Sequence, residues 1–490
     1  MGIRTSQEYL DGLNDGRRVY YQGQLVPSVT QHSELGLAAR HAALDYDLAE
    51  RPDLEDIAIW HDEDGHRCSA FYRIPTSPTD LLIRSRLIEL GTAEGGTLVL
   101  LIKEIGTDAL FALLRVLRRA QDTAGLQRLE SFYRECRDHD YALGVAQTDV
   151  KGNRSKRPGE QKDPDMYLRV VRETSDGIVV RGAKIHTSCS PYADYILVIP
   201  SRTMKAGDEQ WSMAFALPVA TPGLTLYASD FLDHSADSFT QPISFRHRMV
   251  ETLTVFDDVF VPWERVFFAN RPDLAGATAL AFVDFHRFTA VSYKLPLVDA
   301  LLGCGISVAQ ANGIDRASHV REKLPWLAGY AETIRALTEV AARRSRLEQE
   351  ICCPDSFTTN LAKWTFARDF HRAVEIVQDL AGGLLVTGPS GADWRSREIR
   401  AVLEKYLAAA WPAQQRMALI NLISDLTSGS YGGYQAVLAI HAEGSIEAEK
   451  LAMYRSYDGR RAVDLALRLA GIDGIEAQEE EVYVAESATT

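Results

Sequence analysis

The chain has 490 residues, of which 46% are hydrophobic and 24% charged, and its formal net charge is −14. The length predicts about three domain-sized units, and the acidic balance without a basic face excludes a nucleic-acid-binding protein. The sequence has no run of 18 apolar residues and no apolar stretch of a signal peptide at its start, so we expect neither a membrane span nor a secretory leader.

Hydrophobic periodicity divides the sequence into three regions. Residues 1–140 show the i, i+3, i+4, i+7 spacing of amphipathic helices, as in SELGLAARHAALDYDLAE. Residues 141–272 change to short strand patterns such as GIVVRG, YILVIP and TLTVFDDVFVP. Residues 273–490 return to long helical runs such as DFHRAVEIVQDLAGGLL. We therefore predict an α+β fold with an N-terminal helical domain, a central antiparallel β domain, and a C-terminal helical bundle with a tail.

Six cysteines are scattered along the chain, and none forms a CxxC pair. This pattern predicts free thiols in a reducing compartment, and hence a cytoplasmic location. Cys352 and Cys353 are adjacent, but no histidine lies at ligand spacing from them, so we expect no metal site.

The segment from Val145 to Ser190 combines a polar, charge-dense loop with two short apolar strands. So many donors around a small sheet predict a loop that binds a polar cofactor, in a crevice between the sheet and the C-terminal bundle. The sequence has neither a GxGxxG after a strand nor a GxxxxGK[ST]. A Rossmann dinucleotide site and a P-loop are therefore excluded.

Three ordered motifs carry a family resemblance: TDVKGNRSKRPGEQKDPDMYLRVV, VFDDVFVPWERVF and DLAGGLLVTGPS. With RTSQEYLDGLNDGRRVYYQG near the start and HAEGS near residue 445, they resemble the 4-hydroxyphenylacetate 3-hydroxylase / 4-hydroxybutyryl-CoA dehydratase superfamily. The resemblance implies the fold of acyl-CoA dehydrogenases, FAD as the cofactor and a homotetramer.

By this resemblance, two segments enclose the flavin ring. The residues implied are Gln147, Thr148, Asp149, Gly152 and Arg154 along one edge, and Ile185, His186, Thr187 and Ser188 on the other side. Hydroxyl and N–H donors near the ring would tune its electronics. Arg154 could bind the pyrophosphate or a carboxylate, although it could also be a solvated loop residue. Gly382 and Gly383 would approach the FAD tail, often across a subunit boundary, although such a pair alone is typical of a helix C-cap.

One branch of the superfamily holds a [4Fe–4S] cluster on three cysteines and a histidine. In this sequence Leu100, Glu104 and Tyr293 occupy the cysteine positions, and His286 matches the histidine. Without these thiolates a cluster cannot be held. We therefore expect no iron–sulfur cluster and no dehydratase chemistry.

The other branch comprises monooxygenases that receive FADH2 from a separate NAD(P)H:flavin reductase and oxygenate a phenol through a flavin C4a-hydroperoxide. These enzymes bind the phenol with an Arg and a Tyr at the start of the GTDALFALL helix, where this sequence has Gly106 and Leu110. They also have a histidine shortly before the flavin loop, where Gly144 and Val145 are the nearest positions. The chain thus departs from both branches.

The catalytic candidates are His286, Glu251 and Tyr293. Imidazole is a suitable base or donor near neutral pH, but His286 could instead be a packed helix residue. Glu251 matches an acidic residue that faces the site in the dehydratases, and Tyr293 could line the pocket. Leu110 and Ser430 are the candidate substrate contacts.

The sequence favours the oxygenase component of a two-component, FADH2-dependent monooxygenase. Its small-molecule substrate would be aromatic or heteroaromatic, and either a natural-product intermediate or carrier-bound. The alternative is an O2-independent flavoenzyme, a dehydrogenase or isomerase, in which Glu251 or His286 abstracts the α-proton of an acyl thioester. A non-catalytic flavin-binding protein is a third possibility.

Overall fold

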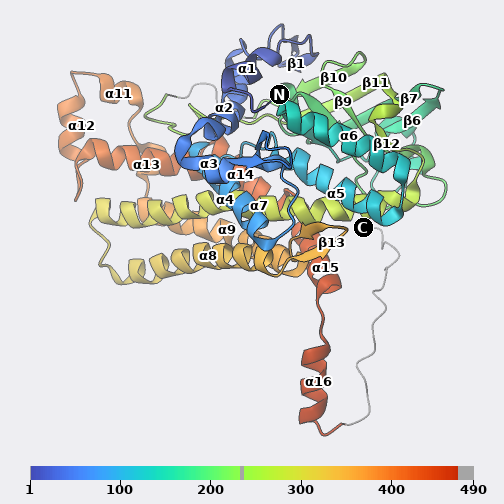
Figure 1. Ribbon diagram of the computed structural model, residues 1–490. Helices are drawn as coiled ribbons and strands as arrows, with labels where there is room; N and C mark the ends of the chain where they lie inside the picture. The colour runs from blue at the N-terminus through green and yellow to red at the C-terminus, as the bar shows by residue number, and fades with distance from the viewer. Residues whose placement is uncertain (1, 232–236, 473–490) are drawn as a thin grey trace.

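The computed structural model describes residues 2–231 and 237–472 (Figure 1). The end of the predicted C-terminal tail, residues 473–490, lies outside the described residues. A helical N-terminal region lies beside a β domain, and both rest on a long helical bundle. The structure thus has the predicted α+β arrangement.

Helix caps set the start of several N-terminal helices. Thr5 and Glu8 form a capping box at α1, and Ser77 and Asp80 form another at α4, which satisfies N–H groups that lack partners within the helix. The helices are α1 (Ser6–Gly12), α2 (Ser33–Glu50), α3 (Glu55–Ala58), α4 (Pro78–Glu94), α5 (Glu104–Ala120) and α6 (Thr123–His139). A hairpin of β3 (Ile59–His61) and β4 (Arg67–Ser69) lies between α3 and α4.

Two sheets form the β domain, in the strand orders β2-β1-β10-β11-β7-β6 and β12-β9-β8-β5. The strands of the first are β1 (Val19–Tyr21), β2 (Gln24–Leu25), β6 (Arg169–Glu173), β7 (Gly177–Ile185), β10 (Leu224–Ala228) and β11 (Thr252–Pro262). Those of the second are β5 (Leu143–Ala146), β8 (Tyr195–Val198), β9 (Ala214–Pro218) and β12 (Val266–Phe268).

The prediction of a wholly antiparallel β domain is corrected at two pairings, because β1 is parallel to β10 and β5 is parallel to β8. Strands β1 and β2 also come from the region predicted to be helical. Strands of two or three residues are too short to show a period of two, and β1 finds its partner about 200 residues later in the chain.

The C-terminal region is a bundle built on α7 (Pro272–Asn312), α8 (Ser318–Arg343) and α9 (Ser356–Ala381). A hairpin of β13 (Arg346–Glu348) and β14 (Ile351–Cys353), absent from the prediction, joins α8 to α9. The remaining helices are α10 (Leu384–Thr387), α11 (Gly391–Arg395), α12 (Arg400–Tyr406), α13 (Ala413–Thr427), α14 (Ser430–His441), α15 (Ile446–Ser456) and α16 (Arg460–Leu469). Figure 1 shows α16 standing away from the body of the molecule.

Helix α7 is the one described helix long and apolar enough to span a membrane by length and composition. It packs on α4, α5, α8 and α9, and most of its apolar side chains are buried there. It is therefore the central helix of the protein core, and its length and apolar composition are explained by that burial.

One main core connects the three regions. Phe111 of α5 meets Phe285 of α7 with ring centroids 5.9 Å apart, and Phe215 of β9 meets Phe256 of β11 at 6.3 Å. Truncating a buried aromatic of this kind costs about 3–5 kcal/mol of stability. The β domain and α7 are thereby fixed relative to α5, and the candidate site lies among them.

Candidate active site

A buried ion pair attaches the polar loop to the sheet. The Asp149 carboxylate lies 2.8 Å from Nζ of Lys184 on β7, and Lys184 also donates to the Gln147 carbonyl at 2.9 Å. The Ile185 N–H donates to the Thr148 carbonyl at 2.9 Å. Asp149, predicted to bind the cofactor, therefore has a structural partner, and Lys184 is a residue that the sequence did not single out.

Lys151 of the polar loop interacts electrostatically with three other basic side chains, Arg154, His186 and Arg202. Lys151 and His186 have left-handed backbones, with φ of 70° and 57°. Burial lowers the pKa of Lys151, and the nearby charges of Arg154 and Arg202 lower it further. Burial and Lys151 likewise lower the pKa of His186. None of the ion pairs between described residues involves Lys151, Arg154 or Arg202, so this cluster is suited to a phosphate or pyrophosphate group.

The hydroxyls at the end of β7 differ in their partners. Oγ1 of Thr187 is buried and has no hydrogen-bond partner among the described residues, whereas Ser188 Oγ donates to the Glu251 carboxylate at 2.9 Å. Gly152 is exposed, with φ of 50°. A buried hydroxyl without a partner beside a cluster of cations fits the FAD that the family resemblance implies, because a flavin supplies both ring acceptors and a pyrophosphate.

Glu251 lies immediately before β11, in a pocket of hydroxyl groups. In addition to Ser188, the Tyr434 hydroxyl of α14 lies 3.4 Å from the carboxylate, and no ion pair to Glu251 exists among the described residues. Burial raises the pKa of Glu251, Ser188 and Tyr434 oppose that shift, and the charge of Glu443 adds to it. The surroundings of Glu251 therefore favour the protonated form more than water does.

Glu443, in the connection between α14 and α15, has the opposite environment. Its carboxylate accepts a hydrogen bond from the Tyr293 hydroxyl and lies 3.1 Å from Lys294 Nζ and 3.6 Å from Lys363 Nζ. Burial alone would raise the pKa of Glu443, but the two lysines outweigh it and hold the pKa at about 2. Burial lowers the pKa of Lys294 to about 8 although Glu443 opposes it.

His286 lies two helical turns before Tyr293 on α7, so both side chains share one face of that helix. Its Nδ1 is 3.3 Å from an oxygen of Asp108 on α5, and its ring stacks on Phe282 with centroids 4.9 Å apart. The charge of His286 also contributes to the low pKa of Glu443. Glu443 therefore accepts a hydrogen bond from Tyr293 and interacts electrostatically with His286 and Glu251.

Close packing leaves no space at Gly106 and Leu110, the two positions where the phenol monooxygenases carry an Arg and a Tyr. A Cβ on Gly106 would come within 2.2 Å of Leu143 Cβ, because α5 lies directly on β5. Leu110 is fully buried in the main core and has no exposed surface to offer a substrate. Ser430 begins α14, one turn before Tyr434, and its role stays a prediction.

Gly382 and Gly383 are not brought to the flavin loop within one chain. Gly382 ends α9 with φ of 77°, and an added Cβ on either glycine would meet nothing within 4 Å. The following helix α10 packs on α13, which lies across the molecule from β6 and β7 (Figure 1). A role in binding the FAD tail would therefore require a second subunit.

Leu100 and Glu104 stand at two positions where the dehydratase branch has cysteines of its iron–sulfur cluster, and both are buried. Leu100 belongs to a small group of buried apolar side chains separate from the main core, and Glu104 is the first residue of α5. Burial, with help from the charge of Asp45, raises the pKa of Glu104 to about 7. Neither residue presents a thiolate.

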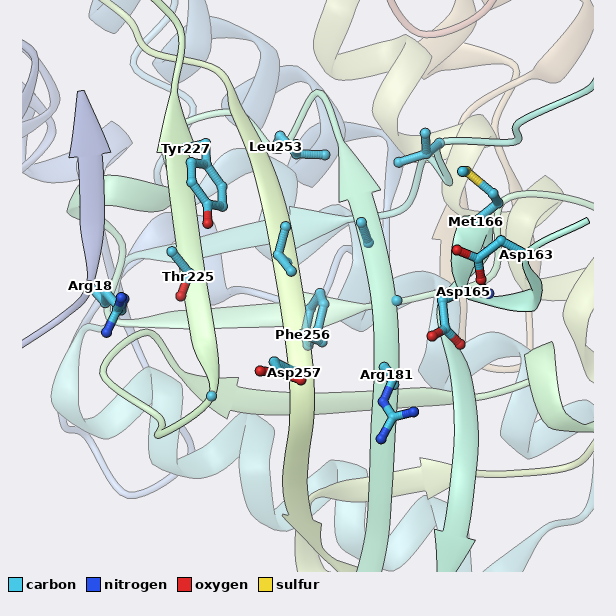
Figure 2. Close-up of a pocket in the computed structure, with 15 residues that line it drawn as sticks. Arg18, Asp163, Asp165, Met166, Arg181, Thr225, Tyr227, Leu253, Phe256 and Asp257 are labelled. Carbon is cyan, nitrogen blue, oxygen red and sulfur yellow. Dashed lines mark hydrogen bonds between the residues drawn. The ribbon is translucent and has the colours of Figure 1, made fainter. Parts of the chain in front are cut away.

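A groove of about 630 Å³ runs along the outer face of the larger sheet (Figure 2). Tyr227 and Leu253 lie toward one end, and Arg181 and Asp257 toward the other. At Val150 the groove adjoins residues 147–154, the loop that the family resemblance implies for flavin binding and that is called the flavin loop here. It is not lined by Glu251, His286 or Tyr293, so this groove and the candidate catalytic residues lie in different places.

Several functional candidates lie in segments whose sequence pattern did not single them out as individual residues. Glu443 lies in HAEGS, which reads as a polar surface turn, and Tyr434 lies in SYGGYQ, which reads as a flexible stretch. Asp108 belongs to GTDAL, where its buried position follows the helical period. Lys151 lies in a charge-dense loop, where the sequence gives no reason to distinguish one lysine from its solvated neighbours.

Family models match nearly the whole chain. The model described as 4-hydroxyphenylacetate 3-hydroxylase N terminal matches residues 5–268, and the corresponding C-terminal model matches residues 275–471. The oxygenase component of 4-hydroxyphenylacetate 3-monooxygenase from Thermus thermophilus is 31% identical over 88% of this chain and 90% of its own length. The 4-hydroxybutyryl-CoA dehydratase/vinylacetyl-CoA-Delta-isomerase of Clostridium aminobutyricum is 26% identical over 96% of this chain and 100% of its own length.

Solved structures give the same assignment. An archaeal 4-hydroxybutyryl-CoA dehydratase from N. maritimus has a TM-score of 0.90 at 27% identity, covering 97% of this chain and 96% of its own. The oxygenase component of 4-hydroxyphenylacetate 3-monooxygenase complexed with FAD has a TM-score of 0.87 at 28% identity, covering 95% and 99%. A glutaryl-coenzyme A dehydrogenase, at 13% identity and a TM-score of 0.50, shares the fold alone. The chain therefore belongs to the 4-hydroxyphenylacetate 3-hydroxylase family of FAD-dependent monooxygenases, on an acyl-CoA dehydrogenase-like fold.

Proposed function

We propose that this protein is the oxygenase component of a two-component monooxygenase that uses FADH2 and O2 to hydroxylate a small aromatic or heteroaromatic substrate. The observation that carries the proposal is the pair of buried carboxylates, Glu251 and Glu443, whose surroundings displace their pKa values in opposite directions beside His286. Such a pair supplies a proton donor and a fixed negative charge within one site.

The cofactor would be held by the flavin loop and the end of β7. Lys151, Arg154 and Arg202 would neutralise the pyrophosphate, and Thr187 Oγ1 would gain the partner that it lacks in the chain alone. Reduced flavin supplies two electrons to O2, so that one oxygen atom enters a C–H bond of the substrate and the other leaves as water.

The protein's own groups would manage the protons of that reaction. His286 would accept the proton of a substrate hydroxyl, and Glu251, hydrogen-bonded by Ser188, would donate the proton that the departing oxygen needs. Glu443, held anionic by Lys294 and Lys363, would keep the Tyr293 hydroxyl oriented toward itself.

The substrate is proposed to differ from a simple 4-hydroxyphenyl acid. Gly106 leaves no space for the arginine that would bind such an acid, and Leu110 is buried in the core. A natural-product intermediate or a carrier-bound acyl group, held by contacts other than an Arg–carboxylate pair, suits this pocket better.

A second candidate function is an O2-independent reaction on an acyl thioester. The dehydratase relative aligns over its full length, and the deprotonated form of Glu251, or His286, could abstract an α-proton. We propose that no iron–sulfur cluster takes part, because Leu100, Glu104 and Tyr293 stand at the positions of the thiolates.

The proposed partner is a separate NAD(P)H:flavin reductase, since relatives of this chain are named as oxygenase components. We also propose a homotetramer, in the cytoplasm. All residues of α16 are exposed except the half-buried Leu467, and its polar side chains form one narrow stripe. The rest of the α16 surface is a broad apolar face, and we propose that a second copy of the chain packs against it.

One experiment separates the two functions. The protein is supplied with FADH2 by a flavin reductase and NADH, under isotopically labelled O2, with a panel of phenols and heteroaromatics. Incorporation of one labelled oxygen atom into a product supports the monooxygenase. Conversion of an acyl-CoA under nitrogen, with no labelled product from the panel, would overturn it in favour of the second candidate.

A further inference from the structure

Asp108 is a fully buried carboxylate near the site, and the proposed chemistry leaves it unused. It lies on α5 with no exposed surface. One of its oxygens, Oδ1, accepts hydrogen bonds from Arg84 Nη2 at 2.8 Å and from Thr289 Oγ1 at 3.0 Å. The other, Oδ2, faces Nδ1 of His286 at 3.3 Å. The carboxylate is thus held between two helices, by Arg84 of α4 and by Thr289 and His286 of α7.

Arg84 holds Asp108 in place. Its guanidinium donates to the carbonyls of Phe71 and Glu104 and to Thr107 Oγ1, and it lies over the rings of Phe71 and Phe111. A planar group that donates to so many fixed acceptors cannot rotate away from the carboxylate. Oδ2 of Asp108 is therefore presented to His286 in one position.

A carboxylate beside an arginine only accepts hydrogen bonds, so the imidazole nitrogen that faces it must carry the proton. Neutral His286 then has its hydrogen on Nδ1 and a free lone pair on Nε2. Among the described residues, no hydrogen bond to Nε2 of His286 exists. The stack on Phe282 holds the plane of the His286 imidazole ring. The direction of Nε2 therefore changes only if the whole side chain rotates.

We propose that Asp108, fixed by Arg84, is a positioning residue that keeps His286 in the Nδ1–H tautomer, so that Nε2 is the atom that takes up the substrate proton. The catalytic part of this inference rests on the proposed function, whereas the tautomer does not. Asp108 acts through His286 and does not touch the substrate itself.

The test compares the wild type with Asp108→Asn. The Arg84 and Thr289 donors will hold the amide oxygen, so the amide N–H will face Nδ1 and drive the hydrogen to Nε2. We expect kcat to fall by about 10²–10³-fold with little change in KM, and Asp108→Glu to recover part of it. Asp284→Asn is the matched control, because it breaks another α5–α7 ion pair, with Arg115 at 3.0 Å, two residues from His286.

Nitrogen-15 NMR of histidine-labelled protein, with the His286 signals assigned from His286→Gln, gives a readout independent of activity. The wild type should show Nδ1 protonated and Nε2 bare at neutral pH, and Asp108→Asn should show the reverse. A wild-type spectrum with Nε2 protonated would overturn the proposal even if the variant does not fold. An absence of oxygenation in the wild type would overturn the proposed function and leave the tautomer result standing.

Discussion

Glu251 and Glu443 are the same side chain in two environments. Glu251 is surrounded by the hydroxyls of Ser188 and Tyr434, whereas Glu443 faces the ammonium groups of Lys294 and Lys363. Burial without a cation raises the pKa of a carboxyl, and two adjacent lysines lower it. The two residues can therefore perform different tasks at the same pH.

Glu251→Gln should lower turnover by about 10²–10⁴-fold, because glutamine keeps the hydrogen bonds and cannot donate a proton. The raised pKa of Glu251 means that activity in the wild type declines as pH rises through that pKa. The variant should lose this decline while its residual rate stays flat. Steady-state rates across pH measure both effects, with the exposed Glu264→Gln as the control. An unchanged alkaline limb in Glu251→Gln would exclude this residue as the donor.

Glu443→Gln should destabilise the fold, because it leaves Lys294 and Lys363 buried without their carboxylate. The expected loss in free energy of unfolding at pH 7 is about 3–5 kcal/mol. The pKa of Glu443 is about 2 in the folded protein against an ordinary 4.5. Its contribution is therefore complete above pH 4.5 and disappears as pH falls toward 2, so the two proteins should converge in that window. Urea unfolding at several pH values tests this, with exposed Glu447→Gln as the control.

The sequence could suggest Glu251 and His286, but it could not suggest Glu443. The carboxylate of Glu443 is buried by Tyr293, 150 positions earlier in the chain. Local pattern carries no information on such a contact, and a polar turn with a glycine is usually solvated. Only tertiary packing reveals the difference.

At the scale of elements, the flavin loop shows what a motif can predict. The polar character of residues 147–154 and the strand GIVVRG were evident in the sequence, and β7 forms as predicted. The role of Asp149 was not evident, because its partner Lys184 alternates with apolar residues and looks like an outward-facing strand position. Because both charges are buried, the ion pair between Asp149 and Lys184 attaches the loop to β7.

Arg154→Ala and Arg202→Ala should each weaken FAD binding by about tenfold or more, because each removes a cation from the proposed pyrophosphate site. Riboflavin, which has the ring and no pyrophosphate, should bind the variants and the wild type equally. Fluorescence titrations with both ligands make the comparison, and Arg172→Ala on β6 is the control. Equal losses for FAD and riboflavin would place these arginines elsewhere on the cofactor.

At the scale of the whole molecule, the three-region division was predictable because long helices and short strands have distinct periods. The entry of β1 and β2 into the larger sheet was not, since RRVYYQG gives too short a signal and its partner β10 is distant in sequence. The position of α16 outside the body also has no counterpart in the helical pattern itself.

Leu465→Glu combined with Leu469→Glu should dissociate the proposed tetramer, because both side chains lie one turn apart on the apolar face of α16 and are exposed in the single chain. Sedimentation velocity should show a smaller species than the wild type at equal concentration. Arg461→Gln, on the polar stripe, should leave the mass unchanged. Identical sedimentation of the double variant and the wild type would show that α16 has no part in assembly.

The separation in sequence between Glu443 and its two lysines has a consequence for biosynthesis. Lys294 and Lys363 are made long before the carboxylate that neutralises them, so a nascent polypeptide that has produced α7 and α9 still lacks their counter-charge. Closing contacts over such long loops is slow. The pocket around Glu443 can therefore close only after the ribosome has synthesised residue 443, and until then Lys294 and Lys363 must keep their contact with water.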